Sequence, residues 1–374
     1  MSLKIVKREG RPYLYVRGTV RGQTVFESTE TADPRQAEGY RIKRESELWN
    51  RAVHGTRETV TFTEAVVSYL EAHPPSFSTK RAVNKLLDHF RHVALDKIDQ
   101  VALDGAYRKL LGKDVGSATK TRHVLTPLRA ILEHAARRGW CNRPVFERPK
   151  IDETRTEFRT PEQVDALIDN TAAHAKPLFT FLAGCGTRPK EAFELDWEDV
   201  DLRGSRCVVG QKQGNWRYID MPPRVVAALA ALPHRQGRVF RSSAPTYDKD
   251  GNIKLGDPYR TGETDKGNAS GQAKRVFATA ARLAGWPGEW RAWIPKGGKT
   301  EKREWVSRVP LYALRHSWAS WHYCQHKDLL GLQVDGGWKT IEMVTHYAKK
   351  MPDAYRQDII DWMAGGPTHI RKEA

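Results

Sequence analysis

The break at residues 142–156 constrains the fold of this 374-residue chain more than any other sequence feature. The segment contains Pro144 and Pro149 and few apolar residues at regular spacing, so it is predicted to be a linker. At roughly 150 residues per domain, the length also predicts two or three domains. A single continuous core is therefore not expected.

The first 57 residues are predicted to form a small unit of one β-hairpin and one helix. β-Favouring residues over 10–30 are interrupted by Arg21-Gly22, which indicates a turn. Asp33-Pro34 then supplies an N-cap and a first-turn proline, and Gln36 stands where a capping box would need it. The helix is expected to run to about residue 51.

Residues 58–150 are predicted to form an all-helical bundle. Apolar residues recur at helical spacing, as at Leu125, Leu128 and Leu132. The segment is also densely basic. A solvated helical face explains any single basic cluster, but the sum favours a polyanionic partner. The candidate nucleic-acid-binding residues are Lys80, Arg81, Lys85, Lys120 and Arg122.

Composition supports the same class of partner. The 62 Lys and Arg residues exceed the 45 Asp and Glu residues, giving a formal net charge of +17 that is spread over the whole chain. No apolar run approaches the ~20 residues that span a bilayer, and the N-terminus has no signal-peptide pattern. Four widely spaced cysteines have neither disulfide nor zinc-site spacing. A reduced, cytoplasmic protein without structural metal or a membrane partner is expected.

Residues 156–366 are predicted to form a larger, mixed α+β domain with a small antiparallel sheet. Its helices are expected at 162–173, 178–183, 189–195, 224–232, 271–284, 311–323 and 352–363, with a hairpin near Arg206–Met221. An exposed loop is expected at 244–268, an irregular insertion at 286–308 and a short tail at 367–374. The predicted fold is thus multidomain and mainly α.

Two arginines in this domain are candidates for binding an anion. Pro189 places Arg188 at the start of a helix, where free N–H groups and the positive end of the dipole favour negative charge. The alternative is an ordinary surface pair with Glu191. Leu311, Leu314 and Trp318 recur at helical intervals and would draw Arg315 inward, where it needs an anionic partner.

The other candidates are weak when taken singly. His316 is predicted to be a hydrogen-bonded core histidine more readily than a base. A tyrosine in a helical stretch, such as Tyr347, is usually core, and a turn lysine, such as Lys212, is usually only exposed.

In their order and spacing, however, these residues resemble the catalytic domain of the tyrosine site-specific recombinases, the phage integrase family. The family pattern is Arg-x-x-Glu, a hairpin Lys, His-x-x-Arg, and Gly-His or Gly-Trp with the nucleophilic Tyr nine residues on. The matching residues here are Arg188, Glu191, Lys212, Arg315, Trp338 and Tyr347. Residues 58–150 resemble the family's core-site DNA-binding domain, and residues 1–57 resemble its small arm-site-binding domains.

The resemblance implies DNA strand transfer that needs neither metal, ATP nor another cofactor and that integrates or excises a mobile element. Tyr347 would form a 3′-phosphotyrosyl link, Arg188 and Arg315 would stabilise the phosphate, Lys212 would protonate the leaving 5′-oxygen, and Trp338 would donate a hydrogen bond. The implied partners are double-stranded DNA attachment sites, three further copies of the chain on synapsed DNA, and an accessory DNA-bending protein. In solution the chain is expected to be a monomer.

One departure from the pattern affects the mechanism. Tyr312 stands where the family usually has His, and a phenol is a poor general base near neutral pH, so the base for Tyr347 is unassigned. Two alternatives stay open: a DNA-binding regulator that has lost its chemistry, and a type IB topoisomerase-like strand relaxase.

Overall fold

The computed structural model describes residues 2–54, 60–112, 115–150, 158–210, 216–261, 269–295, 297–298, 300–347 and 351–366. It divides into two compact units, Met1–Glu153 and Thr154–Ala374. The boundary falls inside the segment 142–156 that the sequence predicts as a linker. The finer division near residue 57 stays a prediction. Among the described residues, no helix has the length and apolar character needed to cross a bilayer.

The first unit begins with a three-stranded antiparallel sheet, ordered β1 (Lys4–Lys7), β2 (Leu14–Val20), β3 (Gln23–Ser28), followed by α1 (Pro34–His54). The predicted hairpin and helix are confirmed, and β1 is an additional strand. Arg21 and Gly22 have φ of +46° and +87°, as a tight two-residue hairpin turn requires. The expected capping box is wrong, because Gln36 accepts a hydrogen bond from the Thr31 hydroxyl instead. A small separate core covers one face of the sheet: Leu3, Val16, Val20 and Leu48.

The rest of the first unit is the predicted helical bundle. Its elements are α2 (Phe62–Ala72), α3 (Phe77–Phe90), α4 (Gln100–Leu110), α5 (Ser117–Lys120), a π-helical turn (Thr121–Leu125) and α6 (Thr126–Arg137). The predicted all-helical bundle is therefore confirmed. Its last helical stretch, residues 117–137, is interrupted by the π-helical turn. Pro127 follows that turn and cannot donate a backbone hydrogen bond, which accounts for the local departure from α-helical geometry.

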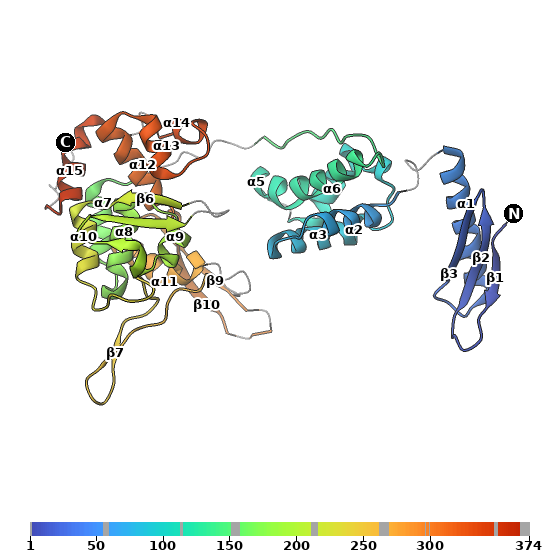
Figure 1. Cartoon of the computed structure of the whole chain (residues 1–374), viewed down its shortest axis with the longest axis horizontal. Coiled ribbons are helices and arrows are strands. Elements are labelled where there is room, and N and C mark those ends of the chain that lie inside the picture. The colour runs from blue at the N-terminus through green and yellow to red at the C-terminus, as the bar shows by residue number, and fades with distance from the viewer. Residues whose placement is uncertain are drawn as a thin grey trace. The chain divides into compact units, whose positions relative to one another are not determined.

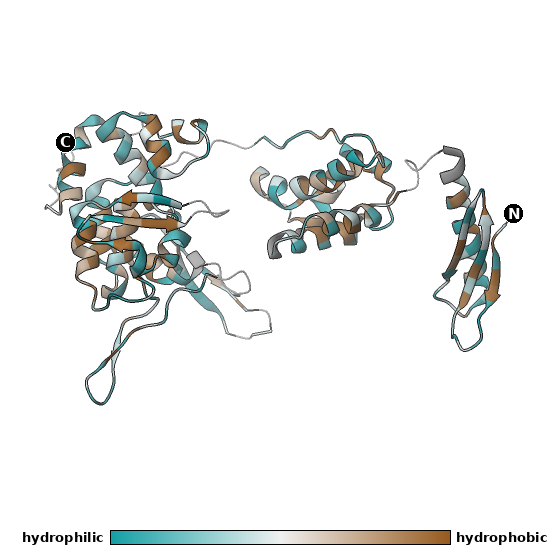
Figure 2. Cartoon of the chain, viewed as in Figure 1, coloured by the Kyte–Doolittle hydropathy of each residue, from teal (hydrophilic) through white to brown (hydrophobic). Residues whose placement is uncertain are grey.

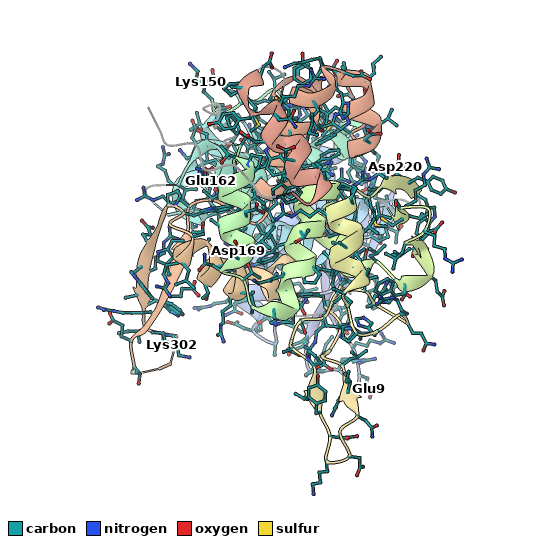
Figure 3. The ribbon with its side chains drawn as sticks, turned by 90° about the vertical axis from the view of Figure 1, so that its left-hand side faces the viewer. Glu9, Lys150, Glu162, Asp169, Asp220 and Lys302 are labelled. Carbon is teal, nitrogen blue, oxygen red and sulfur yellow. The ribbon has the colours of Figure 1, made fainter. Side chains whose placement is uncertain are left out.

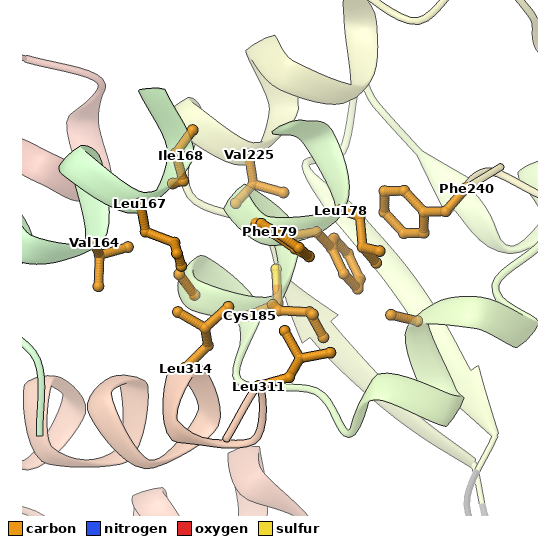
Figure 4. Packing of buried hydrophobic residues seen from close by; sticks show 14 of the residues in the cluster. Val164, Leu167, Ile168, Leu178, Phe179, Cys185, Val225, Phe240, Leu311 and Leu314 are labelled. Atoms are coloured by element: carbon orange, nitrogen blue, oxygen red, sulfur yellow. The ribbon is translucent and has the colours of Figure 1, made fainter. Parts of the chain in front are cut away.

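The second unit is built around one buried helix, α8. Its elements are α7 (Pro161–Asp169), α8 (Lys176–Cys185), α9 (Pro189–Glu194), the sheet β4 (Val200–Asp201), β5 (Arg206–Gly210), β6 (Trp216–Asp220), then α10 (Pro223–Ala230), α11 (Ala269–Leu283), α12 (Ala313–His326), α13 (Leu329–Gly336), α14 (Glu342–Thr345) and α15 (Arg356–Ala364) (Figure 1). Every residue from Leu178 to Cys185 is buried, and hydrophobic colour covers this part of the unit in Figure 2. Figure 4 shows Leu311, which precedes α12, and Leu314 of α12 near Cys185 of α8.

Two hairpins project from the body of this unit (Figure 1). One joins β7 (Thr246–Tyr247) to β8 (Ile253–Lys254) within the predicted exposed loop. The other joins β9 (Gly288–Trp293) to β10 (Lys302–Ser307), so the prediction of an irregular segment at 286–308 is wrong. Trp290 and Trp305 stand directly opposite each other across the two strands, and Trp305 packs against the core of the unit. Figure 3 shows Lys302 on this hairpin, away from the body of the unit.

The packing of α8 against α10 yields a stability prediction. A methyl group added to Gly184 would collide with the side chain of Val225, whereas one added to Gly105 of α4 would meet nothing within 4 Å. We expect Gly184→Ala to lower the free energy of unfolding of the second unit by about 1–3 kcal/mol. Gly105→Ala should raise that of the bundle by up to about 1 kcal/mol, through helix propensity alone.

Urea unfolding of the two variants, followed by tryptophan fluorescence and circular dichroism, measures both effects. Equal stability of Gly184→Ala and the unaltered chain would contradict the tight α8–α10 contact.

Candidate active site

The motif residues of the second unit meet where several helices begin or end. Helix α8 closes with Gly186 in the left-handed conformation, at φ +59°, and the chain then turns sharply into α9. Helix α13 closes in the same way at Gly337, at φ +63°. Arg188 is the N-cap residue of α9, as the sequence predicted, and Trp338 follows directly after α13.

Arg188 and Glu191 form more than a surface pair. The backbone N–H of Arg188 donates to Glu191 Oε2 at 2.9 Å, and its guanidinium Nη1 lies 2.5 Å from Glu191 Oε1. The Glu191 side chain is only 5% exposed, while that of Arg188 is 37% exposed. A second guanidinium nitrogen of Arg188 donates to the carbonyl of Gly337 at 3.4 Å, which ties α9 to the end of α13.

Arg217 is a site residue that the sequence analysis missed. It lies on β6, and its Nη2 donates to Glu191 Oε2 at 3.0 Å, with both side chains less than a tenth exposed. It also donates to the backbone carbonyl of Asp335 in α13. The available signal was period-two alternation, since buried Arg217 and Ile219 alternate with exposed Trp216 and Tyr218.

The carboxylate of Glu191 is kept ionised by these two arginines. Burial alone would raise its pKa, but the charge of Arg217 and the hydrogen bonds from Arg188 outweigh that effect. The net result is a pKa below the ordinary value. Glu191 therefore acts as a charged brace between α9 and the sheet.

Arg315 is buried, as predicted, and only 1% of its surface is exposed. The hydrogen bonds that the structure describes for Arg315 include no carboxylate, and its anionic partner stays a prediction. Its guanidinium donates instead to the backbone carbonyls of Gly186 and, at 2.6 Å, Gly336, and lies 4.1 Å above the Trp338 ring. These carbonyls are at the ends of α8 and α13, where helix dipoles concentrate negative charge.

Burial lowers the pKa of Arg315 to about 10, and the nearby Arg188 and Arg217 contribute in the same direction against an opposing effect of Tyr312. The group is still protonated near neutral pH. Its Nε atom is buried and has no hydrogen-bond partner in the described structure. A buried cation with a spare donor is suited to binding an anion.

Gly186 and Gly336 leave room for two tryptophan rings to pack closely against the backbone at this site. A Cβ on Gly186 would overlap the Trp318 ring, and a Cβ on Gly336 would overlap the Trp338 ring. The two indole rings stack at 6.2 Å between centroids. Their stacking positions Trp338 between Arg315 and Tyr347.

Tyr347 belongs to the same buried cluster as Trp318 and is 4% exposed. Its ring is 5.5 Å from that of Trp338. Its hydroxyl is 2.6 Å from Nδ1 of His316, the residue after Arg315 on α12. The structure thus joins Arg188, Glu191, Arg315, Trp338 and Tyr347 through one chain of contacts.

The Tyr347 hydroxyl does not ionise readily in this setting. Burial, followed by the neighbouring Tyr312, raises its pKa to about 12, and Arg315 only partly opposes the shift. At pH 7 the phenolate would lie about 7 kcal/mol above the phenol. A proton acceptor or an additional cation must offset that cost if this oxygen is to act as a nucleophile.

The pocket carries a surplus of positive charge. Arg188 and Arg217 both bind the carboxylate of Glu191, whereas the described hydrogen bonds of Arg315 go only to backbone carbonyls. No cluster of three or more His, Cys, Asp or Glu able to hold a metal ion occurs among the described residues. The arrangement can hold a phosphate group beside a tyrosine hydroxyl.

Other predicted residues lie elsewhere. Lys212 falls at 211–215, outside the described residues. The candidate nucleic-acid-binding residues belong to the helical bundle: Lys80, Arg81, Lys85 and Arg122 are exposed, whereas Lys120 is half-buried beside the Tyr107 ring. Tyr312 caps α12, and its ring meets that of His316 edge-on at 4.9 Å.

Sequence comparison finds curated relatives of one kind. The integrase of Salmonella phage P22 is 25% identical over 364 residues, covering 89% of this chain and 87% of the phage protein. The tyrosine recombinase XerC of Rhodospirillum centenum is 30% identical over 161 residues, covering 37% of this chain and 47% of that protein. No protein-family model matches the sequence.

Solved structures share the fold. A lambda integrase dimer bound to a core site gives a TM-score of 0.52 at 13% identity, over 93% of this chain and 96% of that one. The Tn1549 transposon integrase in complex with circular intermediate DNA gives 0.53 at 14% identity, over 80% and 98%. The multidomain, mainly helical fold and the resemblance predicted from the motifs are both confirmed.

The buried pair of Arg217 and Glu191 predicts a large effect of substitution. We expect Arg217→Ala to lower the free energy of unfolding of the second unit by about 3–5 kcal/mol, because it leaves a buried carboxylate short of one partner. Arg206 on the paired strand β5 is a matched control. Its bond to Asp220 is exposed, so Arg206→Ala should cost less than about 1 kcal/mol. Urea denaturation that gave equal losses for the two variants would contradict the assigned role of Arg217.

The lowered pKa of Glu191 predicts acid sensitivity. The pKa of Glu191 is lower in the folded state than in the unfolded state, where a glutamate has a pKa of about 4.3. Such a carboxylate stabilises the fold at any pH above the unfolded pKa. This stabilisation is lost as the pH falls through the folded pKa. We expect Glu191→Gln to be less stable than the unaltered chain at pH 7 and to lose less stability below about pH 4.5.

The measurement is the urea midpoint as a function of pH. Asp220→Asn, which alters an exposed pair in the same sheet, should run parallel to the unaltered chain. A parallel curve for Glu191→Gln would show that this carboxylate is not stabilised in the folded state.

Proposed function

We propose that this chain, which belongs to the tyrosine recombinase (phage integrase) family, is a site-specific DNA recombinase that cuts and rejoins DNA strands to integrate or excise a mobile element. One observation carries the proposal: Trp338 packs against both the Tyr347 ring and the guanidinium of Arg315, whose described hydrogen bonds go to carbonyls and not to a carboxylate. A phosphodiester is the anionic group whose cleavage needs both a nucleophile and concentrated positive charge.

The proposed chemistry is covalent catalysis. The oxygen of Tyr347 attacks phosphorus and forms a 3′-phosphotyrosyl bond while the bond to the 5′-oxygen breaks. Arg188 and Arg315 stabilise the charge that grows on the non-bridging oxygens, and Trp338 donates its indole N–H. Lys212 is assigned by the family resemblance as the donor of a proton to the leaving 5′-oxygen.

The covalent bond keeps the energy of the broken phosphodiester, so rejoining needs no ATP. With two arginines supplying the electrostatic stabilisation, the mechanism requires no metal or other cofactor. Losing one such charged donor typically costs about 3–4 kcal/mol of transition-state stabilisation.

The helical bundle is proposed to bind the core DNA site, with Lys80, Arg81, Lys85, Lys120 and Arg122 contacting the phosphate backbone. Phosphate contacts release counterions, so they dominate affinity and position the protein without reading sequence. The sheet-and-helix module at 1–57 is proposed to hold a second, arm-type site. Both assignments rest on charge and on the family resemblance.

The active assembly is proposed to be four copies of the chain on two synapsed attachment sites, formed from a cytoplasmic monomer. An accessory DNA-bending protein would bring separate binding sites within reach of one copy. A strand relaxase needs no grip on a second site, so the additional N-terminal module favours recombination. A regulator without chemistry has no use for the charged pocket around Tyr347.

A nicked duplex, in which the strand next to the cleavage point is lost on cutting, tests the proposal. The target is first selected by binding from a randomised duplex pool. We expect the unaltered chain to form a covalent adduct that survives denaturing electrophoresis, in the absence of divalent metal. Tyr347→Phe should bind the same duplex within about twofold and form no adduct, because the nucleophilic oxygen is missing.

Tyr247→Phe, on the exposed β7–β8 hairpin, is the matched control and should form the adduct normally. Adduct that joins to a second duplex supports recombination. Adduct with relaxation but no joining would favour a relaxase, and binding without any adduct would leave only a regulator.

A further inference from the structure

His316 contacts the reacting atom of the proposed site. Its Nδ1 lies 2.6 Å from the Tyr347 hydroxyl oxygen, within hydrogen-bond distance. The two rings are tilted by 34° with centroids 5.7 Å apart, so the contact is made by the polar edge of the imidazole. The sequence favoured a structural core histidine at this position. The structure shows that its hydrogen-bond partner is the hydroxyl of Tyr347.

The position is set by the same helix that buries Arg315. His316 follows Arg315 directly on α12, whose buried residues Leu314, Ser317 and Trp318 fix the helix against the core. The imidazole is half-buried, so it is held in place while its ring retains contact with solvent. A base that can exchange a proton with water is able to act repeatedly.

Tyr312 does not occupy the same place. It lies one turn earlier, and its ring packs edge-on against His316. A phenol is a weak proton acceptor near neutral pH, whereas imidazole changes its protonation state between pH 5 and 8. Other charged or titratable groups around the pair are Arg315 on α12 and His346, whose ring is 5.9 Å from that of Tyr347.

We propose that His316 is the general base for Tyr347, and that Tyr312 supports the His316 ring. This inference rests on the proposed function. The Tyr347 hydroxyl proton passes to Nδ1 of His316 as the tyrosine oxygen bonds to phosphorus and the bond from phosphorus to the 5′-oxygen breaks. In rejoining, the 5′-hydroxyl passes its proton to Lys212 and attacks phosphorus, and the departing tyrosine oxygen takes the proton back from the imidazolium.

The role of Nδ1 requires a defined tautomer. To accept from the Tyr347 hydroxyl, neutral His316 must carry its proton on Nε2. Protonation of His316 before the reaction would remove the acceptor. The rate of strand cleavage should therefore rise with pH through the ionisation of this imidazole.

Single-turnover cleavage of the nicked duplex between pH 5.5 and 9 tests the proposal. We expect His316→Gln to cut at least 100-fold more slowly at pH 7.5 and to lose the low-pH limb, since an amide can hydrogen-bond the phenol but cannot take its proton. His316→Ala should be partly restored by added imidazole. His326→Gln, at the exposed end of the same helix, should cut within twofold of the unaltered chain.

Nitrogen-15 NMR of histidine-labelled, DNA-free protein supplies a readout that does not need cleavage. One imidazole should show the Nε2-protonated tautomer, and its Nδ1 signal should shift in Tyr347→Phe and be lost in His316→Gln. Circular dichroism of each variant establishes that it is folded before its rate is interpreted.

The outcomes separate the two proposals. Normal cleavage by His316→Gln with an unchanged pH profile would overturn the role of His316 while the recombinase function stood. Slow cleavage without imidazole rescue and with an unchanged pH profile would show only a structural role and also overturn it. Absence of adduct from the unaltered chain would overturn the proposed function, and the base with it.

Discussion

The buried guanidinium of Arg315 is the interaction on which the site depends. A charge moved out of water is costly unless it is compensated, and in this fold the compensation comes from two helix ends rather than from a carboxylate. The carbonyls of Gly186 and Gly336 hold the group in place without neutralising it. The cation is therefore fixed in position and still available to an anionic substrate.

Arg188 and Arg217, unlike Arg315, are compensated by a carboxylate. Glu191 binds Arg188 and Arg217 at the same time. These ion pairs hold α9 against the sheet and the end of α13. The Arg217 side chain is only 7% exposed and has little surface to offer to a large substrate, whereas that of Arg188 is 37% exposed. Glu191 thus binds two arginines with different roles: Arg217 is buried and structural, and Arg188 remains accessible to a substrate.

Much of this arrangement was predictable from the sequence, because it follows from local rules. Pro189 and the apolar spacing of Leu311, Leu314 and Trp318 correctly predicted a helix start at Arg188 and an inward-facing Arg315. The contacts that join these elements come from residues far apart in the chain. No local pattern indicated that Arg217 would meet Glu191 or that His316 would meet Tyr347.

The errors have the same origin. Residues 286–308 form a hairpin whose strands carry a tryptophan pair, but the lysines and glycines of the turn interrupt the alternation in the sequence. For Arg315 the sequence predicted burial but not the two carbonyls that bind it, because the direction of a helix end is not visible in a sequence.

The two glycines under the tryptophan rings have an evolutionary consequence. Neither Gly186 nor Gly336 has a side chain to offer to a reaction, yet any larger residue would displace Trp318 or Trp338 and with it the carbonyls that grip Arg315. Natural selection should tolerate change at these two positions as poorly as at the arginine itself, for reasons of volume alone.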